Sequence, residues 1–265
     1  MKAGDAVIAQ LDAQVDGIDT DAVTSDELFA VVDLLDANVM LRRSLSDPSA
    51  AESSRVELAS RIFRGKVAPA TLEVLSAFSA AEFESGAAFV EALEREGVRL
   101  KLKAARSDGT LDTVTSDLFQ ALSVVRDHPE LAVALRNPSY GAAEKRELLE
   151  RLFGGRISPV AQALLDRAVR PNLAAFVPTV GGFLRAAAEL AGLTIARVTV
   201  ARPLDESRTV RLKAALEKSA GKPLSLQVHV DPSVIGGVNV AIGDDVIEST
   251  VAARLEDARR QLVNL

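Results

Sequence analysis

Few residues of this chain have the chemistry of a catalytic or metal-binding site. The chain has no cysteine, which excludes disulfides, thiolate metal ligands and thiol nucleophiles, and its only histidines are His128 and His229. His128 precedes Pro129 in an expected turn, and His229 falls on the outward register of an alternating strand. Because a catalytic dyad or a metal site needs convergent partners, we expect ordinary surface histidines, no catalytic residue, no cofactor and no metal ion.

Two short motifs could be taken for ligand sites. Gly236-Gly237 could cradle a phosphate, but it lacks the strand–loop–helix context and the Gly-Lys-Ser/Thr ending of a P-loop. Close backbone packing or a bulge is the better interpretation. Asp244-Asp245 could be a pair of catalytic acids, but a polar hairpin turn is favoured over that reading.

The composition narrows the class of protein. The chain has 265 residues, of which 48% are hydrophobic and 26% are charged, as in ordinary soluble globular proteins. Its net charge of -6 disfavours nucleic acid as a main partner, because phosphate binding needs a basic surface. Four aspartates among the first twenty residues argue against a signal peptide. The most apolar stretch, 173–193, is broken by proline, glycine and charged residues, so we expect a buried helix there and membrane association only through a partner.

The chain contains two copies of one segment. Val23–Phe29 recurs as Val114–Phe119, with Glu27 as a one-residue insertion. From Leu28 onward an offset of 90 positions holds, through an Arg-x-Phe-x-Gly-basic-x-x-Pro string that begins at Arg61 and again at Arg151. Such self-similarity predicts two tandem copies of one domain.

Both copies are expected to be helical. Apolar residues recur at spacings of three and four, and Pro69 and Pro159 suit the first position of a helix. Each copy should form a bundle of five or six short helices. The junction near 81–106 is ambiguous: one long helix could close the first bundle and open the second, with a break at Gly86 as an alternative.

The pattern changes after Gly192. We expect a strand at 195–200, a helix at 207–220, an alternating strand at 224–230, a hairpin at 234–247 and a last helix at 249–262. The predicted fold class is therefore α+β and mostly helical, with two tandem helical bundles followed by a small β-α-β-β-α domain. The predicted domains are 1–90, 91–192 and 193–265.

The segment 231–243 resembles the signature of the ATP synthase delta subunit family, called OSCP in mitochondria. Residues 198–204 and 246–255 also fit that family, although Glu248 and Ser249 stand where Asp and Gly are more usual. The resemblance covers about 94–265, and the extra first copy is similar to the long actinobacterial form with a duplicated helical domain. The signature positions are Asp231, Pro232, Gly236, Gly237 and Gly243.

The resemblance implies a function without catalysis. It implies a peripheral-stalk (stator) component of an F-type ATP synthase, needed for proton-coupled ATP synthesis and peripheral at the cytoplasmic face of the cell membrane. Such a component links the catalytic head, through the N-termini of the alpha subunits, to the b subunits. The family's helix-binding groove lies between the first and fifth helices of the bundle. Its apolar contributors here would be Val98, Leu102, Ala161, Leu164 and Ala168, although these could instead be internal core.

The expected last helix offers a second contact. Its apolar stripe is flanked by positive charge, and it could either pack on its own sheet or hold the b subunits, through Val251, Arg254, Leu255 and Arg259. The first copy suggests a further contact along the head or stalk. The competing classes are a general helical adaptor and an enzyme, which would need a pocket lined with convergent polar groups.

Overall fold

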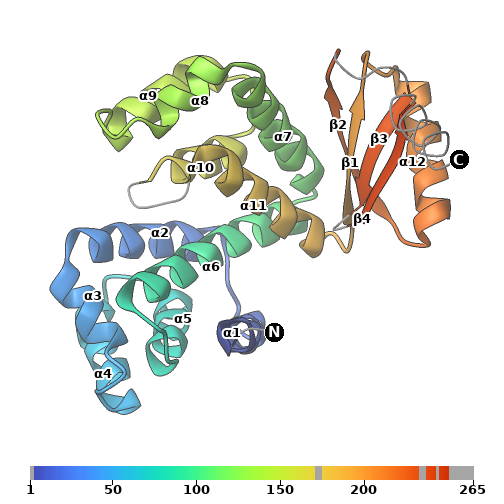
Figure 1. Ribbon diagram of the computed structural model, residues 1–265. Helices are drawn as coiled ribbons and strands as arrows, with labels where there is room; N and C mark the ends of the chain where they lie inside the picture. Colours follow the sequence, from blue (N-terminus) through green and yellow to red (C-terminus); the bar gives the residue numbers. More distant parts are fainter. Residues whose placement is uncertain (1–2, 171–174, 233–236, 243–244, 251–265) are drawn as a thin grey trace, which may run out of the picture. The chain divides into compact units, whose positions relative to one another are not determined.

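The computed structural model describes residues 3–170, 175–232, 237–242 and 245–250 (Figure 1). The chain divides into two compact units, residues 1–110 and 111–265, and each unit is described by itself. The helices of the first unit are α1 (Ala3–Asp16), α2 (Ala22–Ala37), α3 (Val39–Ser46), α4 (Glu52–Phe63), α5 (Pro69–Ala80) and α6 (Gly86–Ser107). The second unit begins with α7 (Leu111–Asp127), α8 (Pro129–Arg136), α9 (Ala142–Phe153), α10 (Pro159–Ala168) and α11 (Phe176–Leu190).

The predicted repeat is confirmed by the helix bounds. Helices α8 and α9 begin and end 90 positions after α3 and α4, and α10 and α11 begin 90 positions after α5 and α6. Gly65 and Gly155 both take positive φ angles, of 75° and 69°, where a side chain would be strained. Both copies therefore use the same backbone turn, after α4 in the first copy and after its counterpart α9 in the second. In the numbering of the first copy, α7 to α11 correspond to the second to sixth helices.

A carboxylate on the second helix of each copy holds the start of the fifth. Glu27 Oε2 accepts a hydrogen bond from the Ala68 backbone N–H at 2.8 Å, and Asp117 Oδ2 accepts one from the Ser158 N–H at 2.7 Å. Glu27 and Asp117 are 90 positions apart and accept equivalent hydrogen bonds from the backbone at the start of the fifth helix. The interpretation of Glu27 as the inserted residue was therefore wrong, and the extra residue of the first copy lies before it.

Helix α6 resolves the ambiguous junction. It runs unbroken from Gly86 to Ser107, and the Ser85 side chain caps its start by accepting from the Ala88 N–H at 3.1 Å. Residues 81–85 before it are not helical, so the long helix expected over 81–106 is interrupted there and begins only at Gly86. The predicted boundary at 90/91 falls within this helix, and the bounds 1–90, 91–192 and 193–265 remain a prediction.

The apolar stretch near 173–193 forms α11, as expected of a buried helix. Its buried side chains include Phe176, Val180, Phe183 and Leu184. Among the helices that the structure describes, none has both the length and the apolar character needed to cross a membrane. Residues 173 and 174 of the stretch lie outside the described residues.

The last part of the second unit is a mixed sheet. It contains β1 (Thr194–Val200), α12 (Glu206–Ala220), β2 (Leu224–Val230), β3 (Gly237–Ile242) and β4 (Asp245–Thr250), with strand order β2-β1-β3-β4. Strands β1 and β2 are connected by α12 and pair in parallel. Strand β3 pairs antiparallel with β1 and with β4. The α+β, mostly helical fold class is thus confirmed. The predicted last helix at 249–262 falls almost wholly outside the described residues.

The first unit has one core, into which α2 and α6 pack most closely. At the crossing of these helices the Ser25 hydroxyl donates to the Gly97 carbonyl oxygen at 2.8 Å. A Cβ atom built on Gly97 would lie 2.6 Å from Cε1 of Phe29, whose ring is itself buried. Glycine at this position is therefore what allows the two helices to cross at this distance.

We expect Gly97→Ala to lower the free energy of unfolding by about 1–3 kcal/mol, because the added methyl overpacks the crossing. Gly181→Ala is the matched control, since Gly181 also lies within a helix but its nearest neighbour would be Arg185 Nη1 at 3.9 Å. There, the better helix propensity of alanine should add up to about 1 kcal/mol. Urea unfolding followed by circular dichroism measures both, and equal shifts in one direction would contradict the close crossing.

Candidate partner-binding surfaces

The five predicted groove residues are all buried. Val98 and Leu102 lie on α6 in the first unit, whereas Ala161, Leu164 and Ala168 lie on α10 in the second. No one of these side chains is more than 3% exposed. Both readings of them, as groove or as internal core, predict apolar residues at these positions, so the groove stays a prediction.

The predicted contacts of the C-terminal domain are only partly described. Val251, Arg254, Leu255 and Arg259, and the signature residues Gly236 and Gly243, lie outside the described residues. Of the remaining signature positions, Asp231 donates its backbone N–H to the Val200 carbonyl oxygen at 2.8 Å, Pro232 follows it, and Gly237 opens β3. These signature residues therefore join the ends of strands in the sheet.

Neither histidine forms part of a polar cluster that could do chemistry. His128 stands at the start of α8, with Nδ1 2.8 Å from the Val124 carbonyl oxygen. His229 lies in β2, opposite Thr199 of β1. Within the described ranges no group of three or more acidic or histidine side chains is arranged to hold a metal ion.

A charged network that we did not predict joins α1 to α6. Arg95 binds Asp12 through two hydrogen bonds of 2.7 Å, one to each carboxylate oxygen. Arg99 donates to Glu96 at 2.9–3.1 Å and to Asp16 at 2.8 Å. The network also includes Lys103, which binds Asp16 at 2.7 Å. A signal was present in the sequence: basic residues at spacings of four on α6 and acidic residues at a spacing of four on α1.

We call this network of Asp12, Asp16, Arg95, Glu96, Arg99 and Lys103 the α1–α6 clasp, and its electrostatics are those of a structural contact between two helices. Burial raises the pKa of the Glu96 carboxyl above its ordinary value of 4.5, and the hydrogen bonds and charge of Arg99 oppose that rise. The hydrogen bond from Lys103 contributes most to lowering the pKa of Asp16. Three cations face three anions within hydrogen-bonding reach, and the Glu96 side chain is 0% exposed. Because this carboxylate is engaged by its own chain, it is unsuited to receive a substrate.

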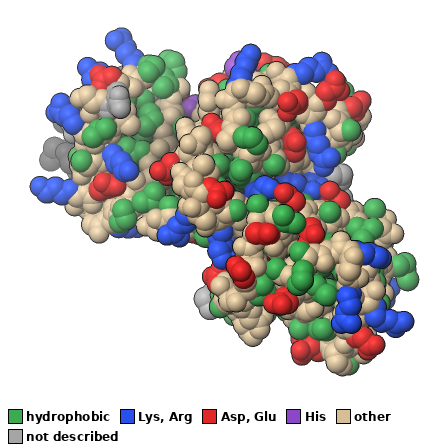
Figure 2. Space-filling view, turned by 180° about the vertical axis from the view of Figure 1, so that it is seen from behind, with side chains coloured by type: hydrophobic (Ala, Val, Ile, Leu, Met, Phe, Trp, Pro, Cys, Tyr) green, Lys and Arg blue, Asp and Glu red, His purple; other side chains and the backbone are tan. Residues whose placement is uncertain are grey.

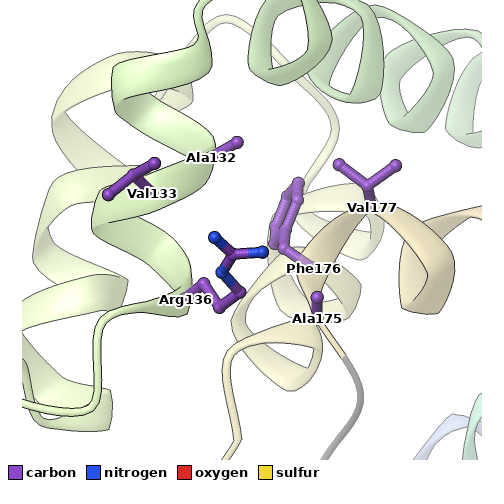
Figure 3. A pocket seen from close by; sticks show the side chains of 6 residues that line it. All are labelled: Ala132, Val133, Arg136, Ala175, Phe176 and Val177. Carbon is purple, nitrogen blue, oxygen red and sulfur yellow. The ribbon is translucent and has the colours of Figure 1, made fainter.

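A small cavity opens between α8 and α11 (Figure 3). Its volume is about 190 Å³, and its lining residues are Ala132, Val133, Arg136, Ala175, Phe176 and Val177. Small-molecule sites usually measure roughly 300–1,000 Å³ and contain several placed polar groups. This cavity offers one guanidinium among apolar side chains, so it is too small and too apolar to be an enzyme's active site.

The surface charge is mixed. In the face shown in Figure 2, basic and acidic side chains are interspersed rather than gathered into a basic stripe. With a net charge of -6, this pattern disfavours binding to a phosphate backbone.

Comparison with known proteins gives a consistent result. The family model described as the ATP synthase delta (OSCP) subunit matches residues 102–262. A protein of Cutibacterium acnes named "ATP synthase subunit delta" is 39% identical, over 96% of this chain and 96% of its own. One of the same name from Streptomyces griseus is 36% identical, over 96% of this chain and 94% of its own. A chain in a cryo-EM structure of the Toxoplasma gondii mitochondrial ATP synthase hexamer matches 64% of this chain and 97% of its own, at 20% identity and a TM-score of 0.37.

We expect Arg99→Ala to destabilise the first unit by roughly 3–5 kcal/mol at pH 7, because it leaves the Glu96 charge buried without its main partner. The pKa of Glu96 should then rise further. Well below pH 4.5 the carboxyl is protonated in both the folded and unfolded states, so this cost is absent. It grows as the pH rises from about 4.5 to the raised pKa and is fully present above that pKa. The deficit of the variant should therefore be larger at pH 7 than at pH 4.5.

Urea unfolding at the two pH values measures that deficit. Arg151→Ala is the control, because the Arg151–Glu147 pair is exposed, with side-chain exposures of 71% and 65%, and such pairs are worth only about 0.5 kcal/mol. A deficit for Arg99→Ala no larger than the control, or one independent of pH, would contradict the clasp.

Proposed function

The chain belongs to the ATP synthase delta (OSCP) subunit family, and we propose that it is a non-catalytic stator component of a bacterial F-type ATP synthase. The observation that carries the proposal is the extent of the similarity. The family model spans the second helical copy and the sheet, and relatives named as delta subunits align along 96% of the chain, the first copy included.

The physical task of a stator is mechanical. It must resist the torque of the rotor while the catalytic head turns over, which requires stiff elements and more than one binding surface. Helical bundles with buried cores, cross-linked by Glu27, Asp117 and the α1–α6 clasp, suit the first requirement. A separate sheet with its own apolar core suits the second, because it adds a surface of a different kind.

The partners we propose are the alpha subunits of the head and the b subunits of the peripheral stalk. The N-terminal helices of alpha subunits would bind the second helical bundle, where Ala161, Leu164 and Ala168 are the groove residues of the second unit. The b subunits would meet the C-terminal domain. The protein would thus lie at the cytoplasmic face of the cell membrane and touch the membrane only through the complex.

An enzyme is disfavoured by what the polar groups do. Glu96, the most deeply buried carboxylate among the described residues, is held by Arg99 and Arg95. The buried Arg55 donates to five backbone carbonyl oxygens, in the segments 47–50 and 79–81. Side chains that would be candidates for acid–base or electrostatic catalysis are therefore used to hold the chain together.

The test is native mass spectrometry of the chain mixed with its organism's catalytic head stripped of this subunit. We expect a mass increase of one 28.0 kDa copy per head. Absence of binding, with both components folded, would favour the general helical adaptor instead.

The groove can be tested with Leu164→Ala, in the second copy, and Val74→Ala at the matching position of the first. Both side chains are 0% exposed in the free chain. If the partner helix uncovers and contacts Leu164, its truncation should weaken head binding about tenfold, which corresponds to roughly 1.4 kcal/mol. Weakening by both variants would extend the role to the first copy. Unchanged affinity of a folded Leu164→Ala variant would show that this residue is internal core only.

A further inference from the structure

The two copies differ where the third helix meets the sixth. In the first copy, a Cβ atom built on Gly86 of α6 would lie 3.2 Å from Cγ of Arg42 and 3.2 Å from Oγ of Ser46, both on α3. The start of α6 therefore packs closely against α3, and a side chain at position 86 would press against Arg42 and Ser46. In the second copy the residue 90 positions later is Phe176, which brings a full aromatic ring to this contact.

This exchange accompanies the opening of the cavity in the second copy. The counterparts of Arg42 and Ser46 are Ala132 and Arg136, so the large and small residues have changed places along α8. Figure 3 shows the Phe176 ring, on α11, and the Arg136 guanidinium, on α8, directed into the same space. Phe176 is 4% exposed and forms a fixed wall, whereas Val133 on the rim is 55% exposed.

The charge at this position has also changed. In the first copy Arg42 forms an ion pair with Asp36 at 3.7 Å. This pair has no equivalent in the second copy, because the counterpart of Arg42 is Ala132 and that of Asp36 is Arg126. Arg136 is exposed and makes no ion pair with any described residue. The second copy thus presents a small apolar cavity with a cation at its edge that pairs with no described residue.

We propose that this cavity receives one apolar side chain from a helix of another subunit of the same ATP synthase, and that a carboxylate on that helix pairs with Arg136. The proposal rests on the proposed function, which supplies the complex. A volume of about 190 Å³ suits a single apolar side chain, whereas small-molecule sites begin near 300 Å³. Side chains three or four positions apart lie on one face of a helix, so one helix can supply both the apolar group and the acid.

The site is distinct from the predicted groove. The cavity lies between α8 and α11, the third and sixth helices of the second bundle, and it shares no residue with the five groove positions. A helix bound there would contact the second copy at the α8–α11 cavity, where the first copy instead has the close contact of Gly86 with α3.

The test compares variants of the full chain for binding to the complete ATP synthase depleted of this subunit, which serves as the probe. Arg136→Glu reverses the charge at the rim, and Ala132→Leu fills the cavity. Each should raise the Kd at least tenfold at low salt, and added salt should narrow the effect of Arg136→Glu. Arg43→Glu is the matched control, because it makes the same charge change at an exposed position on α3 and should leave the Kd unchanged.

The outcomes separate the two proposals. If the wild-type chain binds and both cavity variants bind as tightly, the cavity is not an interface and this inference is overturned, while the proposed function stands. If the variants abolish self-association of the chain and leave the binding to the complex intact, the occupant is a second copy and the inference is again overturned. A folded wild-type chain that does not bind overturns both. Circular dichroism of each variant confirms folding.

Discussion

The fold depends on the fact that several of its helices are too short to be stable alone. Helices α3 and α8 have eight residues each and α10 has ten, whereas isolated helices below about 12–15 residues are marginal in water. Each must therefore bury its apolar stripe against its neighbours. Burial alone leaves helices free to slide, and the hydrogen bonds from Glu27 and Asp117 fix the second helix of each bundle against the fifth. The repeated sequence thus encodes a repeated cross-link as well as a repeated core.

Local rules explain what could be predicted from the sequence. The prolines at 69 and 159 each open a helix, and the offset of 90 recurs in the helix bounds, because these features depend on neighbouring residues only. The α1–α6 clasp was missed because its partners are more than 80 positions apart, and spacing within each helix does not say which helices pair. Gln227 shares the register of His229, which was expected to face outward, yet Gln227 is buried. The predicted groove and the contacts at 251–259 remain predictions.

The two copies share their backbone turns but differ in some of their side-chain contacts. The positive φ angles at Gly65 and Gly155 are shared, and so are the carboxylates that hold the fifth helix. Arg55, by contrast, is buried and bonded to five carbonyl oxygens, whereas its counterpart is Lys145, for which no such bonds are seen among the described residues. The duplicated scaffold has thus kept the turn and the carboxylate that hold the fifth helix, while a buried internal contact made by Arg55 differs between the copies.

Buried ionisable groups with shifted pKa values often mark active sites, and Glu96 has both properties. The geometry decides against that reading, because a catalytic carboxylate needs a face open to substrate, and Glu96 is enclosed between arginines of its own helix. Removing charge from water is costly and is repaid only when geometry and hydrogen bonding are good. Once formed, such a network resists sliding of α1 along α6 better than apolar contacts do, since it is directional. In a protein whose proposed task is to withstand torque, a buried carboxylate of this kind contributes stiffness rather than reactivity.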